Sequence, residues 1–349
     1  MVNFNIDTLV RENVKNLQPY ASARDEFKDA RGNDMVFLDA NENPFDNGVN
    51  RYPDPQQRVL KSKLAAIKNV AVEQILLGNG SDEVLDLLFR AFCEPNQDNI
   101  ITLPPTYGMY GVLAGINANE NRTVLLTDDF EPNIEEILKR IDNKTKLLFI
   151  CSPNNPTANS FSDESVMSLL NNFNGLVVID EAYIDFSERE SWVRRLSEFP
   201  NLVVTQTLSK AYGMAGIRLG ICIASTAVIS ILNKIKPPYN VNELTQLRAL
   251  DQISTPDLTI AAVTDILDQR GILINALRQI SFISHIFKSD ANFLLVRVDD
   301  AEKRYLQLIG KGIVVRNRSR QPLCSNTLRF TVGTPTENKR LISTLKGLE

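Results

Sequence analysis

Hydrophobic residues between positions 79 and 225 follow two alternating patterns. Short runs rich in Val, Ile and Leu are typical of buried strands, and apolar residues three or four apart are typical of helices that cover a sheet. The predicted strands are 99–103, 123–127, 146–152, 175–182, 201–207 and 218–224, and the predicted helices are 81–92, 107–115, 134–141 and 163–173. This alternation predicts an α/β fold in which helices flank a mostly parallel central sheet.

The pattern changes after about residue 253. A long amphipathic stretch over 258–280 precedes further strand-like runs, and a helical pattern over 336–348 ends the sequence. A length of 349 residues favours about two domains. We therefore expect a large domain over 46–252 and a smaller α+β domain over 253–349. Residues 1–45 show little strand pattern and are grouped with the small domain as an N-terminal arm.

Composition and charge narrow the function classes. The chain is 43% hydrophobic and 23% charged, as in ordinary globular proteins, and its formal net charge of −4 offers no basic surface for nucleic acid or an anionic membrane. No run approaches the length of a membrane span, the first residues lack a signal-peptide layout, and the four cysteines are widely spaced. We expect a cytoplasmic protein that binds small molecules and neither nucleic acid nor membrane.

Histidine is nearly absent, which disfavours several kinds of catalytic centre. His285 is the single histidine, and it lies in a strand-like segment. One histidine without a partner pattern makes a histidine-rich metal site or a Ser-His-Asp triad hard to build. We therefore expect no metal centre.

The segment 205–220, TQTLSKAYGMAGIRLG, places an amine, hydroxyls and a guanidinium close together. Lys210 follows an apolar strand, and taken alone it reads as an ordinary solvated lysine. Thr207 and Ser209 precede it and Arg218 follows eight residues later, which supplies donors and charge for a phosphate. The joint pattern suits pyridoxal phosphate, a cofactor that needs an imine-forming lysine and donors for its phosphate.

A carboxylate ends the preceding apolar run. Asp180 closes GLVVID, so its carboxylate is expected at the buried tip of a strand, where it is costly unless it is paired. A protonated pyridine nitrogen is one suitable partner, and a surface Asp just past a strand is the alternative. Tyr183, three residues on, is placed to bond a hydroxyl on the same ring.

Three further motifs supply groups for the same ligand. In GNGSDE, Gly80, Ser81 and Asp82 begin an amphipathic helix whose free N–H groups either hold a phosphate or are simply capped. In PPTYGMYG, Tyr107 either stacks on a flat ring or packs in the core. In SPNNPTA, Asn155 lies in a turn and can donate its amide to a ring oxygen. The dinucleotide and P-loop motifs are excluded, because neither GxGxxG nor GxxxxGK[ST] is complete.

These residues, in this order, resemble the fold-type-I pyridoxal phosphate aminotransferases, which share NPT, D-x-x-Y, and S-K with an arginine eight residues on. Further motifs are similar to those of the histidinol-phosphate aminotransferase family: GNGSDE, PPTYGMY, LQPY at 17–20, LDANENP at 38–44, RYPDP at 51–55 and LRFTVGT at 328–334. The resemblance covers nearly the whole chain. It implies a large domain with a mostly parallel sheet flanked by helices, plus a smaller α+β domain.

The resemblance also implies a role for each matched residue. The catalytic set would be Lys210, Asp180 and Tyr183: Lys210 would carry the covalent link and move the proton, and Asp180 would hold the ring nitrogen. Asn155 and Tyr183 would bond the ring oxygen, and Tyr107 would stack on the ring. The cofactor phosphate would be held by Gly80, Ser81, Asp82, Thr207, Ser209 and Arg218, and by Tyr52 of the neighbouring subunit.

The substrate-binding residues implied by the resemblance are Tyr20, Asn41, Arg316 and Arg329. One pair of guanidinium groups can hold either a carboxylate or a phosphate, since both are forked anions. Arg318 and Arg320 follow Arg316 closely in the sequence, so which of the three meets the substrate stays open.

One residue departs from the family pattern. Ala158 stands where the NPTG turn of the family has glycine. If this position has a positive φ, alanine costs about 1 kcal/mol of local strain, and otherwise the change is neutral. Catalysis is expected to survive in either case.

The reaction implied by the resemblance moves an amino group between L-histidinol phosphate and 2-oxoglutarate, giving imidazole-acetol phosphate and L-glutamate in histidine biosynthesis. The implied assembly is a homodimer with shared active sites. An aromatic amino-acid aminotransferase and a threonine-phosphate decarboxylase-like enzyme are alternatives, because the motifs fix cofactor chemistry better than side-chain choice. A silent regulatory module that only binds pyridoxal phosphate is a third alternative, disfavoured by the presence of Lys210.

Overall fold

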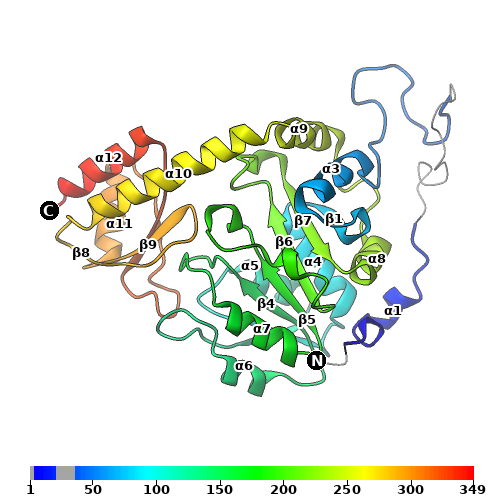
Figure 1. Ribbon diagram of the computed structural model, residues 1–349, viewed down its shortest axis with the longest axis horizontal. Coiled ribbons are helices and arrows are strands. Elements are labelled where there is room, and N and C mark those ends of the chain that lie inside the picture. Colours follow the sequence, from blue (N-terminus) through cyan, green and yellow to red (C-terminus); the bar gives the residue numbers. More distant parts are fainter. Residues whose placement is uncertain (1–3, 21–35) are drawn as a thin grey trace.

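A seven-stranded sheet forms the centre of the larger part of the molecule (Figure 1). The structure is a computed structural model that describes residues 4–20 and 36–349. The strand order is β1-β7-β6-β5-β4-β2-β3, and β7 runs antiparallel to both neighbours while the other pairs are parallel. The strands are β1 (Ile75–Asn79), β2 (Asn99–Thr102), β3 (Glu120–Thr123), β4 (Thr145–Cys151), β5 (Leu176–Asp180), β6 (Leu202–Thr207) and β7 (Leu219–Ala224). The predicted α/β fold with a mostly parallel sheet is confirmed.

Helices cover both faces of this sheet, because successive strand residues point to opposite sides. Val177 and Ile179 of β5 pack into one buried cluster, whereas Leu176 and Val178 pack into the other. The first cluster includes residues of α3 (Arg58–Lys68), α6 (Ile134–Arg140), α7 (Asp163–Asn172) and α9 (Glu243–Ile253). The second includes residues of α1 (Glu12–Lys15), α4 (Ser81–Phe92), α5 (Met109–Ile116) and α8 (Thr226–Ile235). Short 3₁₀ helices in the connections are η1 (Ile6–Thr8), η2 (Val72–Gln74), η3 (Ile184–Phe186), η4 (Trp192–Arg195) and η5 (Ala215–Ile217).

One strand lies earlier in the chain than the hydrophobic pattern predicts. The prediction was 123–127, whereas β3 covers Glu120–Thr123 and forms the sheet edge beside β2. Val124 and Leu126, which carried the prediction, are buried just beyond the strand in the core. An edge strand needs little apolar sequence, so the pattern pointed to the neighbouring core segment instead.

The described beginning of the chain packs on the seven-stranded sheet. Leu9, Val10 and Val14 are buried in the cluster that includes α4 and α8. The Lys234 ammonium on α8 donates a hydrogen bond of 3.0 Å to the carbonyl of Lys15. The apolar side chains of this segment therefore join the larger unit, which differs from the grouping of residues 1–45 with the small domain. The limits at 46–252 and 253–349 stay a prediction.

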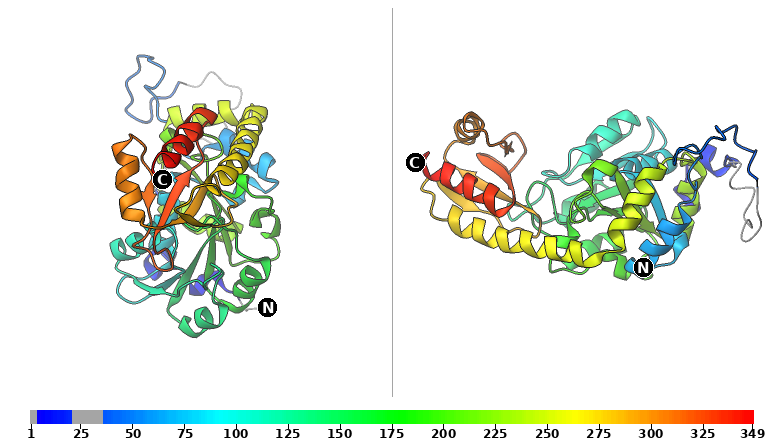
Figure 2. Two further views of the ribbon diagram at one scale, coloured as in Figure 1. Left: turned by 90° about the vertical axis from the view of Figure 1, so that its left-hand side faces the viewer. Right: turned by 90° about the horizontal axis from the view of Figure 1, so that it is seen from above.

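A four-stranded antiparallel sheet forms the second unit, in the order β10-β11-β9-β8. Its strands are β8 (Ile283–Ile286), β9 (Phe293–Val298), β10 (Arg316–Asn317) and β11 (Thr327–Thr331), and the helices around it are α10 (Pro256–Leu277), α11 (Ala301–Gly310) and α12 (Pro335–Lys346). Helix α10 runs from the large unit to the small one (Figure 2). Leu294 and Leu328 face its core, so alternation places Arg297, Arg316 and Arg329 on the opposite face of the sheet.

Three further observations concern the described residues alone. None of their helices combines the length and the apolar character that crossing a membrane requires. The four cysteines are unpaired and buried. No group of three or more His, Cys, Asp or Glu side chains in this part of the chain could hold a metal ion.

Candidate active site

Three neighbouring parallel strands end side by side. The predicted site residues at or just beyond their ends are Asn155, Asp180, Tyr183, Thr207, Ser209 and Lys210. Cys151 at the end of β4 pairs with Asp180 at the end of β5, and β6 ends beside them at Thr207. In open α/β sheets, ligands bind at such carboxyl ends. A hollow of about 130 Å³ lies there, lined by Ser81, Asp82, Tyr107, Cys151, Asn155, Asp180, Ala182, Tyr183, Thr207, Ser209, Lys210, Ala215 and Arg218. It includes every predicted cofactor residue except Gly80 and Tyr52.

The carboxylate of Asp180 is buried at the wall of this hollow, with a side chain only 4% exposed. Burial raises its pKa, and hydrogen bonds from Tyr110 and the Ala182 backbone oppose that rise. The Tyr110 hydroxyl donates to Oδ2 at 2.8 Å, and the Ala182 N–H donates to Oδ1 at 3.2 Å. No cation among the described residues forms an ion pair with Asp180. A buried carboxylate in this state suits a positively charged group of a ligand.

Tyr110 is a site residue that sequence reasoning missed. It lies on α5, is fully buried and stacks on Phe149 with ring centroids 4.8 Å apart. It also meets Tyr107 edge to face at 5.5 Å. The available signal was the spacing in PPTYGMYG, because two tyrosines three residues apart in the predicted helix 107–115 would share one face. In the structure Tyr107 precedes α5, which begins at Met109.

Lys210 reaches toward Tyr183, with Nζ 5.6 Å from the centroid of the ring. Its turn is closed by a hydrogen bond of 3.0 Å from the Gly213 N–H to the Lys210 carbonyl. Loss of surrounding water lowers the pKa of Lys210, Arg329 lowers it further, and Asp180 opposes both. No carboxylate of the described chain pairs with this ammonium. These surroundings favour the neutral, nucleophilic amine.

The start of α4 approaches Arg218 and β7 so closely that two positions require glycine. A Cβ on Gly80, which has φ +79°, would lie 2.6 Å from Nη2 of Arg218. A Cβ on Gly220 would lie 2.3 Å from the backbone nitrogen of Ser81. No side chain caps the first turn of α4. Its N–H groups and the Arg218 guanidinium therefore converge, as a phosphate requires.

Hydroxyls and a carboxylate complete this end of the hollow. Thr207 donates to the Ser209 hydroxyl at 2.9 Å. The Asp82 carboxylate accepts from the Tyr107 hydroxyl at 3.1 Å and pairs with Arg218 at 3.4 Å. An anionic carboxylate repels phosphate, so Asp82 holds the tyrosine and the guanidinium in position, and only its backbone can meet a phosphate directly.

A second group of contacts links the hollow to the four-stranded sheet. The Asn155 amide donates to the Tyr183 hydroxyl at 3.5 Å and accepts from the Arg329 guanidinium at 2.5 Å. The Tyr183 ring packs edge to face on Phe293 of β9 at 5.1 Å. Burial, followed by the charge of Arg318, lowers the pKa of Arg329 to about 10. Arg329 thus joins the predicted substrate region to the predicted cofactor region.

The three candidate substrate-binding arginines, Arg316, Arg318 and Arg320, differ in burial and in their neighbours. Arg316 lies directly opposite Arg329 in the strand register and is exposed. Arg318 is half-buried, its Nε has no hydrogen-bond partner, and burial followed by the charge of Arg316 lowers its pKa. Arg320 is exposed. No carboxylate of the described chain pairs with Arg316 or Arg318, so no acidic side chain there neutralises the guanidinium groups around Arg329.

Three predicted residues do not reach the Lys210 hollow within one chain. Tyr20 is 75% exposed, and Tyr52 is 51% exposed and stacks on Tyr239 at 4.5 Å. Asn41 and Tyr52 instead line a separate surface hollow of about 410 Å³, together with Leu244 of α9. Any part that these residues take in the site must come from a partner chain or from movement.

Ala158 has the positive φ on which the sequence argument depended. Its φ is +70°, and its side chain is fully buried. The methyl group belongs to a cluster that includes Tyr183, Phe186 and Phe293. Strain at this position is therefore accompanied by packing that glycine would not provide.

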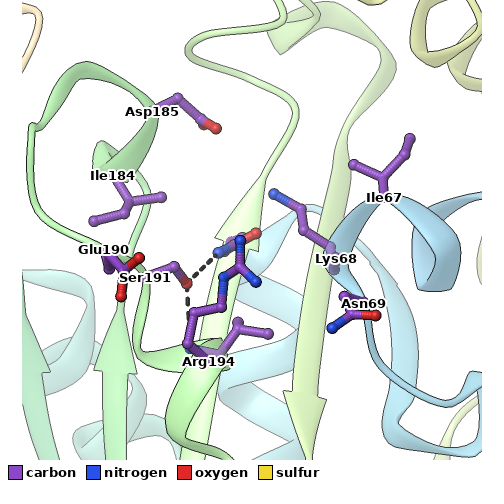
Figure 3. A pocket seen from close by; sticks show the side chains of 10 residues that line it. Ile67, Lys68, Asn69, Ile184, Asp185, Glu190, Ser191 and Arg194 are labelled. Atoms are coloured by element: carbon purple, nitrogen blue, oxygen red, sulfur yellow. Dashed lines mark hydrogen bonds between the residues drawn. The ribbon is translucent and has the colours of Figure 1, made fainter.

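Figure 3 shows another hollow, beyond β6, which none of the predicted site residues lines. Its walls carry two cations and two carboxylates, and its full lining is Ile67, Lys68, Asn69, Ile184, Asp185, Glu190, Ser191, Val193, Arg194 and Gln206. Gln206 donates to buried Glu181 at 2.8 Å and to Ser191 at 3.2 Å, as the polar network of a folded core requires. The chemistry-bearing groups are in the Lys210 hollow instead.

The Lys210 hollow fits pyridoxal phosphate. It combines an amine of lowered pKa, a buried carboxylate without an ion pair, and a tyrosine ring beside both. The uncapped start of α4 and Arg218 lie at its other end. These are the groups needed for the aldehyde, the ring nitrogen, the ring face and the phosphate of that cofactor.

Comparison with known proteins leads to the same chemistry. Residues 27–345 match the model of the family described as aminotransferase class I and II. The chain is 66% identical to a histidinol-phosphate aminotransferase of Flavobacterium johnsoniae over 346 residues, which cover 99% of each chain.

Two solved structures share the fold. The histidinol-phosphate aminotransferase of Clostridium acetobutylicum has a TM-score of 0.80 and 24% identity, covering 86% of this chain and 91% of its own. That of Sinorhizobium meliloti, in complex with pyridoxal-5'-phosphate, has a TM-score of 0.78 and 23% identity, covering 85% and 82%. Together with the family match and the relative at 66% identity, these findings show that the chain belongs to the aminotransferase class I and II family and is a pyridoxal phosphate-dependent aminotransferase.

Proposed function

We propose that the protein moves an amino group between L-histidinol phosphate and 2-oxoglutarate, giving imidazole-acetol phosphate and L-glutamate in histidine biosynthesis. The observation that carries this proposal is the 66% identity, over 99% of both chains, to an enzyme named histidinol-phosphate aminotransferase. The guanidinium groups around Arg329 support this proposal, because L-histidinol phosphate and 2-oxoglutarate both carry anionic groups. Unpaired, buried cysteines accord with action in the cytoplasm.

Lys210 is proposed as the catalytic base. Pyridoxal phosphate, when bound, supplies an electron-withdrawing ring that stabilises negative charge at the substrate carbon. The Lys210 amine would form the covalent link to the cofactor aldehyde and, once free, would move the proton between the substrate Cα and C4′ of the cofactor. Its lowered pKa keeps more of the amine neutral at physiological pH.

The ring contacts are assigned to the residues around Asp180. The Asp180 carboxylate would hold the protonated ring nitrogen, and Tyr110 would orient that carboxylate and keep it charged. Tyr183 and Asn155 would bond the ring oxygen, since their polar atoms already lie together at the hollow. Tyr107, held by Asp82, would stack on the ring.

The phosphate contacts are assigned to the start of α4 and to the turn after β6. Backbone N–H groups at Ser81 and Asp82 would point at the phosphate oxygens. The Gly80 N–H already donates to the Arg218 carbonyl at 2.8 Å, so the predicted phosphate contact of Gly80 is not assigned to its backbone nitrogen. The hydroxyls of Thr207 and Ser209 and the guanidinium of Arg218 would complete the set, with Tyr52 of the partner chain as a further donor. The Arg218–Asp82 pair would loosen when phosphate binds, because one guanidinium then serves two anions.

The substrate anion is assigned to Arg329 together with Arg316 and Arg318. These three guanidinium groups share one region, and Arg316 is paired directly with Arg329 in the strand register. Like charges on neighbouring strands repel one another, and a bound phosphate or carboxylate would remove that repulsion. One set of arginines can thus accept both substrates in turn. Tyr20 and Asn41 would approach from the arm segments.

A homodimer with shared active sites is proposed from the exposed surface around Tyr52. The hollow that holds Tyr52 also contains Val49 and Leu244, which are 52% and 64% exposed. Nearby segments of the chain expose Val36 (80%), Leu38 (85%), Phe45 (80%) and Val59 (70%). Apolar side chains in this number are typical of a surface that another chain covers. A second copy would bring Tyr52 to the neighbouring site.

Turnover with alternative donors tests the reaction. Purified protein is assayed with 2-oxoglutarate and either L-histidinol phosphate or L-phenylalanine, and release of carbon dioxide from L-threonine phosphate is measured in parallel. We expect kcat/KM to be highest with histidinol phosphate. Preference for phenylalanine, or decarboxylation of threonine phosphate, would replace the proposal by one of the two related enzymes. Absence of turnover with all three would indicate a silent module.

A further inference from the structure

Lys61 is a buried lysine on α3 whose ammonium has no partner among the described residues. Its side chain is only 5% exposed, and no hydrogen bond or ion pair of the described chain reaches Nζ. Burial, followed by the nearby charge of Lys236, lowers its pKa to about 8. Burying a cation without a partner costs free energy, and a bound anion would offset that cost.

The amine lies at a hollow of about 370 Å³ between α3, η2 and α8. Besides Lys61, its walls include Arg58, Glu73, Thr226 and Ser230. None of these residues lines the Lys210 hollow. The hollow is large enough for a small phosphate compound, and the cofactor does not account for it.

Helix α8 begins at this hollow and supplies further donors. Thr226 is its first residue, and the preceding Ser225 makes no side-chain capping bond. The N–H groups of this first turn are therefore available, and the helix dipole favours an anion there. Ser230 lies four residues beyond Thr226, so both hydroxyls are on the same side of the helix.

The other charged groups near Lys61 have partners of their own or are exposed to solvent. Four charged groups affect its pKa: Lys236 and Arg58 lower it, and Asp54 and Glu73 raise it. Arg58 pairs with Asp54 at 2.7 Å. Lys236 donates to the carbonyls of Pro55 and Pro237 at 3.1 Å and to the Asn240 side chain at 3.2 Å. Glu73 is exposed to solvent. Of the cations Lys61, Arg58 and Lys236, the Lys61 ammonium is the one that makes no hydrogen bond or ion pair with another described residue.

We propose that this hollow binds a small phosphate-bearing anion, held by the Lys61 ammonium, the first turn of α8 and the hydroxyls of Thr226 and Ser230. A tetrahedral oxyanion offers several acceptors at once, which matches one ammonium, two hydroxyls and free helix N–H groups. The site does not depend on the proposed reaction, because it shares no residue with the Lys210 hollow.

The test measures the reactivity of the Lys61 amine in the holoenzyme. The protein is trace-acetylated at pH 8 and constant ionic strength, with chloride alone, with inorganic phosphate or with glycerol 3-phosphate, and labelling is quantified by mass spectrometry. We expect phosphate to lower labelling of Lys61 at least about ten-fold, because a bound anion stabilises the unreactive ammonium. Lys63, exposed on the same helix, is the internal control and should not respond.

A double variant, Thr226→Val with Ser230→Ala, removes the hydroxyls but keeps the amine, and we expect it to reduce the protection to less than about three-fold. Protection by inorganic phosphate alone assigns the site to the free ion, and protection by both compounds assigns it to phosphate esters. The proposal is overturned if neither compound protects Lys61, if Lys63 is protected equally, or if Lys61 is unlabelled in chloride.

Discussion

The hollow at Lys210 and the surface hollow at Tyr52 differ in how complete they are within one chain. The first brings Lys210 and Arg218 of the segment 205–220 together with Ser81 and Asp180 from other parts of the chain. The second holds Asn41 and Tyr52 in the open, with Tyr52 half exposed. Folding of a single chain therefore brings together the groups proposed for catalysis. The groups proposed to bind the substrate and the cofactor phosphate are complete only when a partner chain or a movement brings Asn41 and Tyr52 to the site.

Sheet geometry explains this difference. Parallel pairing fixes the ends of β4, β5 and β6 beside one another, so residues that follow those ends have no freedom to lie elsewhere. The segment around Tyr52 is outside both sheets, and its position depends on local turns and on α9. Substrate specificity can therefore change through residues outside the sheet while the catalytic centre stays the same.

Replacement of Lys210 should have the largest effect. In Lys210→Ala we expect turnover to fall at least about 10³-fold, because the proton at the substrate Cα loses its acceptor. The matched control is Lys63→Ala, which removes an exposed lysine of α3 and should leave turnover within two-fold. Mass spectrometry after borohydride treatment checks the covalent link independently: wild type and Lys63→Ala should gain the cofactor mass, and Lys210→Ala should not. A gain in Lys210→Ala would place the linking lysine elsewhere.

Arg329 should have the next largest effect, because it joins the two regions. In Arg329→Gln we expect kcat/KM to fall about 10²-fold for both the phosphate-bearing donor and 2-oxoglutarate, since a charged hydrogen-bonding group is removed from a partly buried site. Steady-state kinetics with each substrate varied in turn measures this. A loss confined to one substrate would show that donor and acceptor use different anion sites.

The neighbouring arginines sharpen that result. We expect Arg316→Gln and Arg318→Gln each to lower kcat/KM about ten-fold, because both guanidinium groups lie beside Arg329. Arg320→Gln is the matched control, and as an exposed residue it should change kcat/KM less than two-fold. If Arg320→Gln were the most damaging of the three, the strand register would not predict which arginines meet the substrate.

Mixed dimers test whether Tyr52 acts across the subunit boundary. We expect Tyr52→Ala to lose about thirty-fold in activity at limiting cofactor, through weaker phosphate binding. When it is unfolded and refolded with an equal amount of Lys210→Ala, about half of the dimers are mixed and each has one intact site, so about a quarter of wild-type activity should return. Activity that stays at the average of the two separate variants would place Tyr52 in the site of its own chain.

The predicted cofactor residues other than Gly80 and Tyr52 line one hollow, because the carboxyl ends of parallel strands lie together and most of the motifs follow such ends. Their roles in the site stay a prediction. Tyr110 escaped prediction, since its partner Asp180 is 70 residues away and only the packing of α5 on the sheet brings them together. The sequence also left undecided which of Arg316, Arg318 and Arg320 lies beside Arg329, for a related reason. The register between β10 and β11 decides which arginine lies there, and a shift of one residue would move every side chain of the strand to the other face of the sheet.

Tyr110→Phe should have a smaller effect, on pH dependence more than on the maximal rate. The Tyr110 hydrogen bond lowers the pKa of Asp180, which burial raises, so its loss should raise that pKa further. The charged carboxylate is lost as pH falls through its pKa, and a higher pKa moves this loss to higher pH. We therefore expect the acidic limb of the kcat/KM profile to shift upward, with activity about ten-fold lower on that limb and cofactor binding weakened at the same pH.

The matched control for Tyr110→Phe is Tyr107→Phe, which removes a hydroxyl bonded to Asp82 and leaves Asp180 untouched. It should leave the acidic limb in place. An equal shift in both variants would mean that looser packing of the two tyrosine rings, and no specific bond to Asp180, sets the profile.

The smallest effect is expected at Ala158, where strain and packing nearly cancel. Glycine would relieve about 1 kcal/mol of strain at φ +70°, but it would remove a buried methyl group worth about 0.8 kcal/mol and add flexibility to the unfolded chain. We expect Ala158→Gly to change the free energy of unfolding by less than about 1 kcal/mol, measured by urea denaturation. Ala158→Val, with a branched side chain at the same φ, should destabilise by more than about 3 kcal/mol. Stabilisation of about 2 kcal/mol by glycine would mean that the methyl group contributes strain and no packing.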